Sequence, residues 1–202
     1  MVKSVQQIKR KVYQGNDPSE QIDYENIIQL SSKGLNDDLT GTFTRVIFLD
    51  RAEAMLKDKQ DDHILALCFI DLDNLKILND TNGHSAGDIA LKKIGSILRE
   101  YGAKYDGIAG RYGGDEFILI LRDIDNSDEL HTVLKELVDR LKFIIYCEDK
   151  EIEIHCSIGA SIWHKGLTLE TLISNADKAL YNVKCHGKAN YSLFLNGGHD
   201  EI

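Results

Sequence analysis

The chain has 202 residues, enough for one ordinary domain and a short extension, and its 43% apolar and 28% charged content is typical of a globular protein with a buried core. The net charge is −9 at pH 7, and no basic cluster that could bind nucleic acid appears beyond Lys9, Arg10 and Lys11. The longest apolar run, Ile64 to Ile70, is too short to cross a bilayer. We therefore expect no nucleic-acid binding, no membrane insertion, and a cytoplasmic, reducing location in which the four cysteines stay unlinked.

Helix and strand patterns alternate along most of the chain. Residues 1–34 are polar and predict a helical or partly disordered linker, 35–196 a folded domain, and 197–202 a C-terminal tail. In chain order, the patterns predict a helix over 43–56, a buried strand over 64–70, a helix from Ser85 to Leu98, a strand over 117–121, a helix over 130–145, a strand over 151–163, a helix over 169–183 closed by Gly187, and a last strand at the sheet edge over 191–195. We expect an α/β (α+β) fold with a central mixed sheet flanked by helices.

The first candidate for chemistry is Asp71, directly after the apolar run that ends at Ile70. A carboxylate at the end of a buried strand is held rigidly and remains open to solvent. Magnesium prefers oxygen ligands and shares them among one or two carboxylates, waters and phosphates. The alternative is an aspartate that only ends the strand and starts a turn.

The second candidate is the segment Gly113-Gly114-Asp115-Glu116, which precedes the strand expected over 117–121. Two glycines between strands predict a tight hairpin turn. Asp115 or Glu116 could then face the same edge as Asp71, where two carboxylates would bind a divalent cation and, through it, a triphosphate. A solvated acidic hairpin explains the residues equally well.

The run Gly113 to Phe117 reads GGDEF and resembles the signature of the GGDEF family of diguanylate cyclases. Three further blocks resemble that family in the same order, so that the resemblance spans about residues 35–195. These blocks are Asp38 to Gly41, which is similar to the family's opening Asp-x-Leu-Thr-Gly with one residue fewer; Asp71 to Asp80 with Gly83-His84 and Gly87-Asp88; and Ala176 to Tyr181 with Lys184 and Gly187-Lys188.

The resemblance implies a palm fold like that of class III nucleotide cyclases, and a role for each matched residue. It implies metal binding by Asp71, Asp115 and the backbone carbonyl of Leu72, with Mg²⁺ as the ion and Mn²⁺ as an alternative. It implies that Asp115, assisted by Glu116, accepts a proton, and that Lys76 stabilises the transition state. For substrate binding, it implies guanine recognition by Asn79 and Asp88, a neighbouring contact by His84, and phosphate contacts by Lys184 and Lys188.

Plainer interpretations stay open for several of these residues. Asp88 could cap a helix that begins at Ser85, and His84 could simply lie in a turn. Lys184 and Lys188, four residues apart near a helix end, could both reach one phosphate tail or could only complement the helix dipole. Ala189 follows Lys188 where the family more often has asparagine.

One family feature is absent from the sequence. Many members carry an Arg-x-x-Asp pair upstream of the signature that binds cyclic di-GMP and inhibits the enzyme. Lys104 and Gly107 occupy those positions here, so we expect no inhibitory site.

The resemblance implies an enzyme of bacterial second-messenger signalling that condenses two GTP into cyclic di-GMP and acts as a homodimer. Two alternatives fit the sequence less well. A non-catalytic module that binds GTP or cyclic di-GMP would not require Asp71, Lys76, Asp115 and Lys184 together. A cyclase making mixed cyclic dinucleotides is disfavoured by the carboxylate of Asp88, which suits guanine.

Overall fold

The computed structural model describes residues 34–59, 63–147, 150–195 and 198–199. The predicted linker (1–34) and the predicted tail (197–202) therefore fall almost wholly outside the described residues. The boundaries expected for the folded domain stay predictions.

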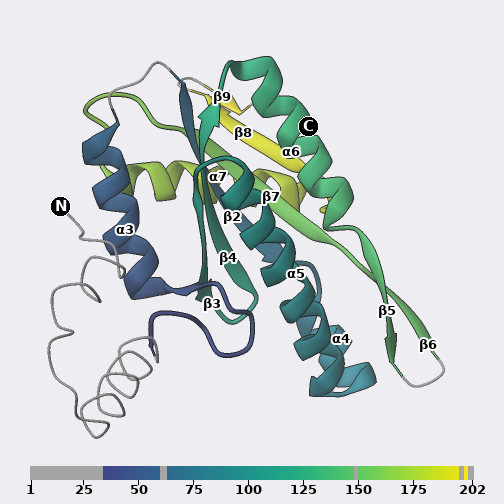
Figure 1. Ribbon diagram of the computed structural model, residues 1–202. Helices are drawn as coiled ribbons and strands as arrows, with labels where there is room; N and C mark the ends of the chain where they lie inside the picture. Colours follow the sequence, from purple (N-terminus) through teal and green to yellow (C-terminus); the bar gives the residue numbers. More distant parts are fainter. Residues whose placement is uncertain (1–33, 60–62, 148–149, 196–197, 200–202) are drawn as a thin grey trace, which may run out of the picture. The chain divides into compact units, whose positions relative to one another are not determined.

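Seven strands of the described residues form one mixed sheet (Figure 1). In spatial order they are β1 (Phe43–Thr44), β3 (Ile108–Gly113), β4 (Glu116–Ile124), β2 (Ile64–Leu72), β7 (Cys156–Ile162), β8 (Tyr191–Leu195) and β9 (Gly198–His199). The central strand β2 pairs antiparallel with β4 on one side and with β7 on the other, whereas β1–β3 and β7–β8 are parallel pairs. The predicted α/β class with a central mixed sheet is confirmed.

Two layers of helices cover the two faces of this sheet (Figure 1). Helices α3 (Arg45–Asp58) and α7 (Leu169–Cys185) pack on one face, and α5 (His84–Lys104) and α6 (Ser127–Arg140) pack on the other. Because side chains alternate along a strand, odd-numbered residues of β2 from Leu65 to Phe69 join the α3–α7 core, and even-numbered residues from Ala66 to Ile70 join the α5–α6 core. The strand is buried on both faces, as its solid apolar run predicts.

Two predicted elements in the second half of the chain are wrong in part. The helix expected over 130–145 ends at Arg140, and β5 (Phe143–Cys147) follows it and pairs with β6 (Lys150–Ile154) in a separate two-stranded sheet. The apolar residues of β5 are aromatic or β-branched, which favours a strand over a helix. The strand expected over 151–163 is two strands, β6 and β7, which are interrupted at His155 and lie in different sheets.

The other differences concern the ends of elements. The first helix begins at Arg45 rather than residue 43, β2 extends two residues beyond Ile70, and β8 is paired on both of its sides rather than lying at the edge. A short helix, α4 (Leu75–Asn82), was not predicted. None of the described helices has the length and apolar character needed to span a membrane.

Candidate active site

Asp71 lies at the end of the central strand, next to side chains from three other elements. Because β2 continues to Leu72, Asp71 belongs to the strand rather than following it, and it is only 8% exposed. Its backbone pairs with Glu116 of β4 on one side and with Ser157 of β7 on the other. As an odd-numbered residue of β2 it faces α7, from which the Lys184 ammonium approaches Asp71 Oδ2 to 2.8 Å.

The hairpin between β3 and β4 carries the other two acidic residues. Gly114 and Asp115 form its two-residue turn, as the glycine pair predicts, and Glu116 begins β4. The backbone N–H of Leu72 donates to the carbonyl of Asp115 at 3.1 Å, which ties the turn to the end of β2. Asp71, Asp115 and Glu116 are therefore brought to one edge of the sheet.

These carboxylates perturb one another. Burial raises the pKa of Asp71, the nearby Lys184 opposes this effect, and the charges of Asp115 and Asp73 add to it. Burial also raises the pKa of Glu116, and the charges of Asp71 and Asp115 raise it further. The charged forms of these two carboxylates are stabilised by nearby positive charge. Lys184 supplies part of that charge, and a divalent cation would supply more.

The donors present suit a shared magnesium ion. The described residues contain no cluster of three His, Cys, Asp or Glu side chains that could hold a metal ion, so side chains alone would not complete its coordination. An ion bound here would take its protein ligands from Asp71, Asp115 and the carbonyl of Leu72, and its remaining ligands from water and phosphate. Magnesium binds in this way at phosphoryl-transfer sites.

Helices α4 and α5 hold the residues expected to recognise the base. The side-chain oxygen of Asn79 is buried and has no hydrogen-bond partner in the structure. A Cβ atom on Gly87 would collide with that oxygen, so the glycine allows the oxygen to lie against α5. An unpaired buried acceptor costs about 1–3 kcal/mol, which a hydrogen bond from an N–H donor would offset. Asp88, the next residue after Gly87, is exposed, as is His84.

The helix-cap interpretation of Asp88 is wrong. Helix α5 begins at His84, and its N-cap is Gly83 rather than Ser85, with no side-chain capping bond. The first turn holds no acidic residue, and Asp88 lies beyond it. The carboxylate of Asp88 therefore has no capping role to perform.

The lysines expected at the phosphates are arranged differently from the sequence-based expectation. Helix α7 ends at Cys185, so Lys188 lies outside it and does not share helical spacing with Lys184. The Lys188 ammonium donates instead to Asn74 Oδ1 at 2.8 Å, and Asn74 is the N-cap residue of α4. A hollow of about 440 Å³ opens beside this contact. Lys76 is exposed in the first turn of α4.

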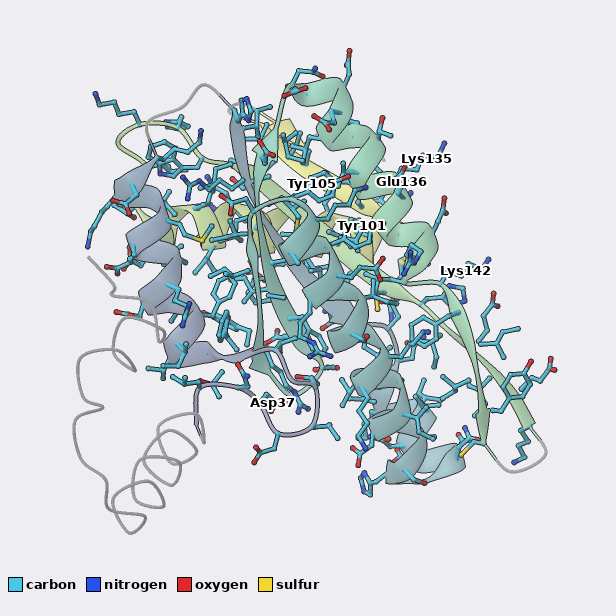
Figure 2. All side chains as sticks on the ribbon, viewed as in Figure 1. Asp37, Tyr101, Tyr105, Lys135, Glu136 and Lys142 are labelled. Atoms are coloured by element: carbon cyan, nitrogen blue, oxygen red, sulfur yellow. The ribbon has the colours of Figure 1, made fainter. Side chains whose placement is uncertain are left out.

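Sequence reasoning missed a pair that supports the turn. Two nitrogens of Arg111 (Nε and Nη2) donate to the carbonyl of Gly114 at 3.1 and 2.7 Å, and Nη1 donates to both carboxylate oxygens of Asp37 at 3.2 and 3.3 Å. Asp37 also accepts from the backbone N–H and the hydroxyl of Thr40. The carboxylate of the opening block is therefore Asp37, not Asp38, and the block is a complete Asp-x-Leu-Thr-Gly. Figure 2 shows Asp37 in its loop near the ends of β3 and β4.

The positions of the missing inhibitory pair offer little to an anionic ligand. A side chain at position 107 would collide with the carbonyl oxygen of Ile120. The Lys104 ammonium lies 4.7 Å from the centre of the Tyr105 ring. Asp106 lies in a turn before β3 and pairs with Arg122 at 3.7 Å. Figure 2 labels Tyr105 beside Tyr101 and Glu136 of the adjoining helices.

Comparison with known proteins gives one family. Residues 35–190 match the family described as diguanylate cyclase, GGDEF domain. The chain is 35% identical over 170 residues to the bifunctional diguanylate cyclase/cyclic di-GMP phosphodiesterase MucR of Pseudomonas aeruginosa, covering 83% of this chain and 24% of MucR. It is 33% identical over 168 residues to diguanylate cyclase DgcS of Shewanella oneidensis, covering 82% of this chain and 54% of DgcS. The chain thus spans about a quarter to a half of these relatives.

Solved structures show the same fold. The coiled coil and GGDEF domain of DgcB from Caulobacter crescentus, in complex with c-di-GMP, superposes with a TM-score of 0.78 at 24% identity, over 87% of this chain and 93% of that one. The GGDEF domain of TpbB (YfiN) from Pseudomonas aeruginosa superposes with a TM-score of 0.73 at 27% identity, over 79% and 94%.

Proposed function

This chain belongs to the GGDEF family, and on that premise we propose that it is a diguanylate cyclase, which condenses two GTP into cyclic di-GMP and two pyrophosphates. The observation that carries the proposal is the convergence of Asp71, Asp115 and Glu116 at the end of the central strand, with Lys184 beside them. Burial and the neighbouring carboxylates raise the pKa values of Asp71 and Glu116, and a bound cation would stabilise the charged forms of both groups.

In the reaction, the 3′-hydroxyl oxygen of one GTP bonds to the α-phosphorus of the other, the bond from that phosphorus to the bridging oxygen breaks, and pyrophosphate leaves. The same step, repeated in the opposite direction, closes the ring. Mg²⁺, held by Asp71, Asp115 and the carbonyl of Leu72, would supply neutralisation of phosphate charge. Asp115, with Glu116 beside it, accepts the proton of the attacking hydroxyl.

The remaining matched residues bind and orient the nucleotide. Asn79 and Asp88 present oxygen acceptors to the N1–H and N2–H₂ donors of guanine, and His84 contacts the substrate nearby. The ammonium groups of Lys76, Lys184 and Lys188 meet the phosphates. The N-terminus of α4, where Lys188 contacts Asn74, adds backbone N–H groups suited to phosphate oxygens.

Each domain holds one GTP in this arrangement, because one chain carries one set of these residues. Both bonds of the product then form where two domains face each other, so the active species is a homodimer related by a two-fold axis.

The proposal is tested with purified protein, Mg²⁺ and either GTP, ATP or both, followed by identification of the products. The parent protein is expected to make cyclic di-GMP from GTP and no product from ATP alone. Asp71→Ala and Asp115→Ala are each expected to lower turnover by more than about a hundred-fold, because each removes a metal ligand. Circular dichroism checks that both variants are folded. Near-normal turnover of either variant at saturating Mg²⁺ would refute the metal assignment.

A further inference from the structure

The loop that follows α7 has an unusual backbone. Gly187, Lys188 and Ala189 all have positive φ angles, of 110°, 65° and 52°. Glycine adopts this conformation readily, whereas in a residue with a Cβ atom that atom crowds the carbonyl oxygen and makes the conformation unfavourable. Two such residues in succession persist only where neighbouring groups hold them in place.

Two side chains hold this loop. The backbone N–H of Ala189 lies 3.2 Å from both Asp73 Oδ2 and Ser157 Oγ. The Ser157 hydroxyl donates to the Asp73 carboxylate, with Oγ 2.9 and 3.0 Å from its two oxygens. Ser157 is fully buried, so its hydroxyl cannot readily exchange Asp73 for water, whereas Asp73 is half-buried and Ala189 is exposed. We call these three residues the Asp73–Ser157–Ala189 clasp.

The clasp joins the three segments that surround the proposed triphosphate site. Asp73 follows the end of β2, Ser157 lies in β7, and Ala189 lies directly after Lys188. The residue after Asp73 is Asn74, which accepts from the Lys188 ammonium at 2.8 Å. Asp73 thus holds the backbone of the loop at Ala189, and the next residue, Asn74, holds the ammonium group of Lys188.

We propose that Asp73 and Ser157 are positioning residues that set Lys188 at the triphosphate, and that Asp73 is not a metal ligand although it stands two residues after Asp71. The proposal rests on the proposed function of the site. Both oxygens of Asp73 already accept hydrogen bonds from the protein. Asp71 differs, because its carboxylate contacts the ammonium group of Lys184 at 2.8 Å, and the substrate phosphates would compete for that group.

The test measures binding of 3′-deoxy-GTP with Mg²⁺ by calorimetric titration, since this analogue lacks the attacking hydroxyl and cannot react. Ser157→Ala and Asp73→Ala are expected to weaken binding about ten-fold, which is the usual effect of breaking one buried hydrogen bond. Asp73→Asn keeps an acceptor for Ala189 and should bind within about three-fold of the parent protein. Ser161→Ala removes a buried serine hydroxyl elsewhere on β7 and is the matched control, expected to bind like the parent.

A double-mutant cycle shows whether the clasp acts through the lysine. In a Lys188→Ala background, Ser157→Ala is expected to cause less than about a two-fold further loss, because the group it positions is gone. A merely structural serine would weaken binding equally in both backgrounds, and that result would overturn the proposal.

The metal assignment is tested by titrating Mg²⁺ at a fixed concentration of 3′-deoxy-GTP. Half-saturation is expected at the parent's Mg²⁺ concentration in Asp73→Asn and at a much higher one in Asp71→Asn. Equal shifts in the two variants would make Asp73 a ligand and overturn the proposal. If the parent protein itself does not bind the nucleotide, the proposed function fails, and the positioning role with it.

Discussion

The unpaired acceptor at Asn79 and the exposed carboxylate of Asp88 suggest how one base would be chosen over another. Guanine offers N–H donors to both groups, whereas adenine offers a ring acceptor at N1 that a carboxylate repels. A site built around buried hydrogen-bond partners rejects mismatched substrates strongly.

We therefore expect Asp88→Ser to relax base choice before it destroys activity. The ratio of GTP to ATP consumption should fall by at least about ten-fold, while turnover of GTP alone falls less. Competition between the two nucleotides in one reaction measures the ratio. An unchanged preference for GTP would mean that Asp88 does not recognise the base.

The positions of side chains were predicted correctly where a motif fixes both residue type and spacing. Asp71, Asp115 and Glu116 converge as expected because a strand end and a two-residue turn leave the chain few alternatives. The position of Lys188 was predicted wrongly because its contact depends on the left-handed backbone conformation of Lys188 and Ala189, which lie outside the helix. The groups that hydrogen-bond to this segment, Asp73 and Ser157, are distant in the sequence, so local pattern could not reveal it.

The loop before β1 supports the turn between β3 and β4 through the ion pair of Asp37 with Arg111. Burial alone would raise the pKa of Asp37, but hydrogen bonds from Thr40 and the guanidinium of Arg111 outweigh it and lower the pKa from its ordinary 3.8. A carboxyl group whose pKa is lowered on folding stabilises the protein above its unfolded-state pKa, and the contribution is lost as the pH falls through the folded-state value.

Asp37→Asn is therefore expected to lower the free energy of unfolding by about 1–2 kcal/mol at pH 7, and by progressively less below about pH 4. Urea denaturation at several pH values measures this. Asp38→Asn, a change at the exposed neighbour, is the control and should have no effect. An equal loss from both variants would mean that Asp38 contributes as much as Asp37, and it would contradict the assignment of the block's carboxylate to Asp37.

Close packing at Gly107 leaves no room for the acidic side chain of the inhibitory pair. A Cβ atom there would overlap the Ile120 carbonyl, whereas one at nearby Gly102 would make ordinary contacts of 3.4–3.5 Å. Gly107→Ala should cost about 2–3 kcal/mol of stability and Gly102→Ala much less. Equal thermal unfolding temperatures for the two variants would show that position 107 has room for a side chain.

The same region gives a functional prediction. Cyclic di-GMP added to a steady-state assay is expected to inhibit only as a competitor of GTP, and equally in the parent protein and in Lys104→Ala. Lysine lacks the planar fork of arginine that grips phosphate or guanine with two hydrogen bonds. Potent inhibition that disappears in Lys104→Ala would contradict this account.

Elements were predicted well where the hydrophobic period is strong. The buried run of β2 and the stripe of α7 are both present, because each must fill a core face. The β5–β6 hairpin was missed because its short apolar run joins the preceding helix without a glycine or proline between them. The start of α5 was misjudged because Gly83, rather than a serine, occupies its N-cap.

For the whole molecule, the family expected from the order of four motifs is confirmed by the comparison with known proteins, and the expected fold class is confirmed by the structure. Pairing between strands distant in the chain was not deducible from local pattern. Strand β2 lies between β4 and β7, which places Asp71 between Glu116 and Ser157. That arrangement explains why the proposed metal site and the proposed positioning network meet at one point.

The most direct measurement of the central claim is the stoichiometry of products formed from GTP and Mg²⁺ by the purified protein. The account predicts two pyrophosphates released for each cyclic di-GMP, identified by mass spectrometry, with a rate per protein that rises with protein concentration until the homodimer is fully formed. Release of inorganic phosphate and GDP, with no cyclic dinucleotide at any protein concentration, would contradict it.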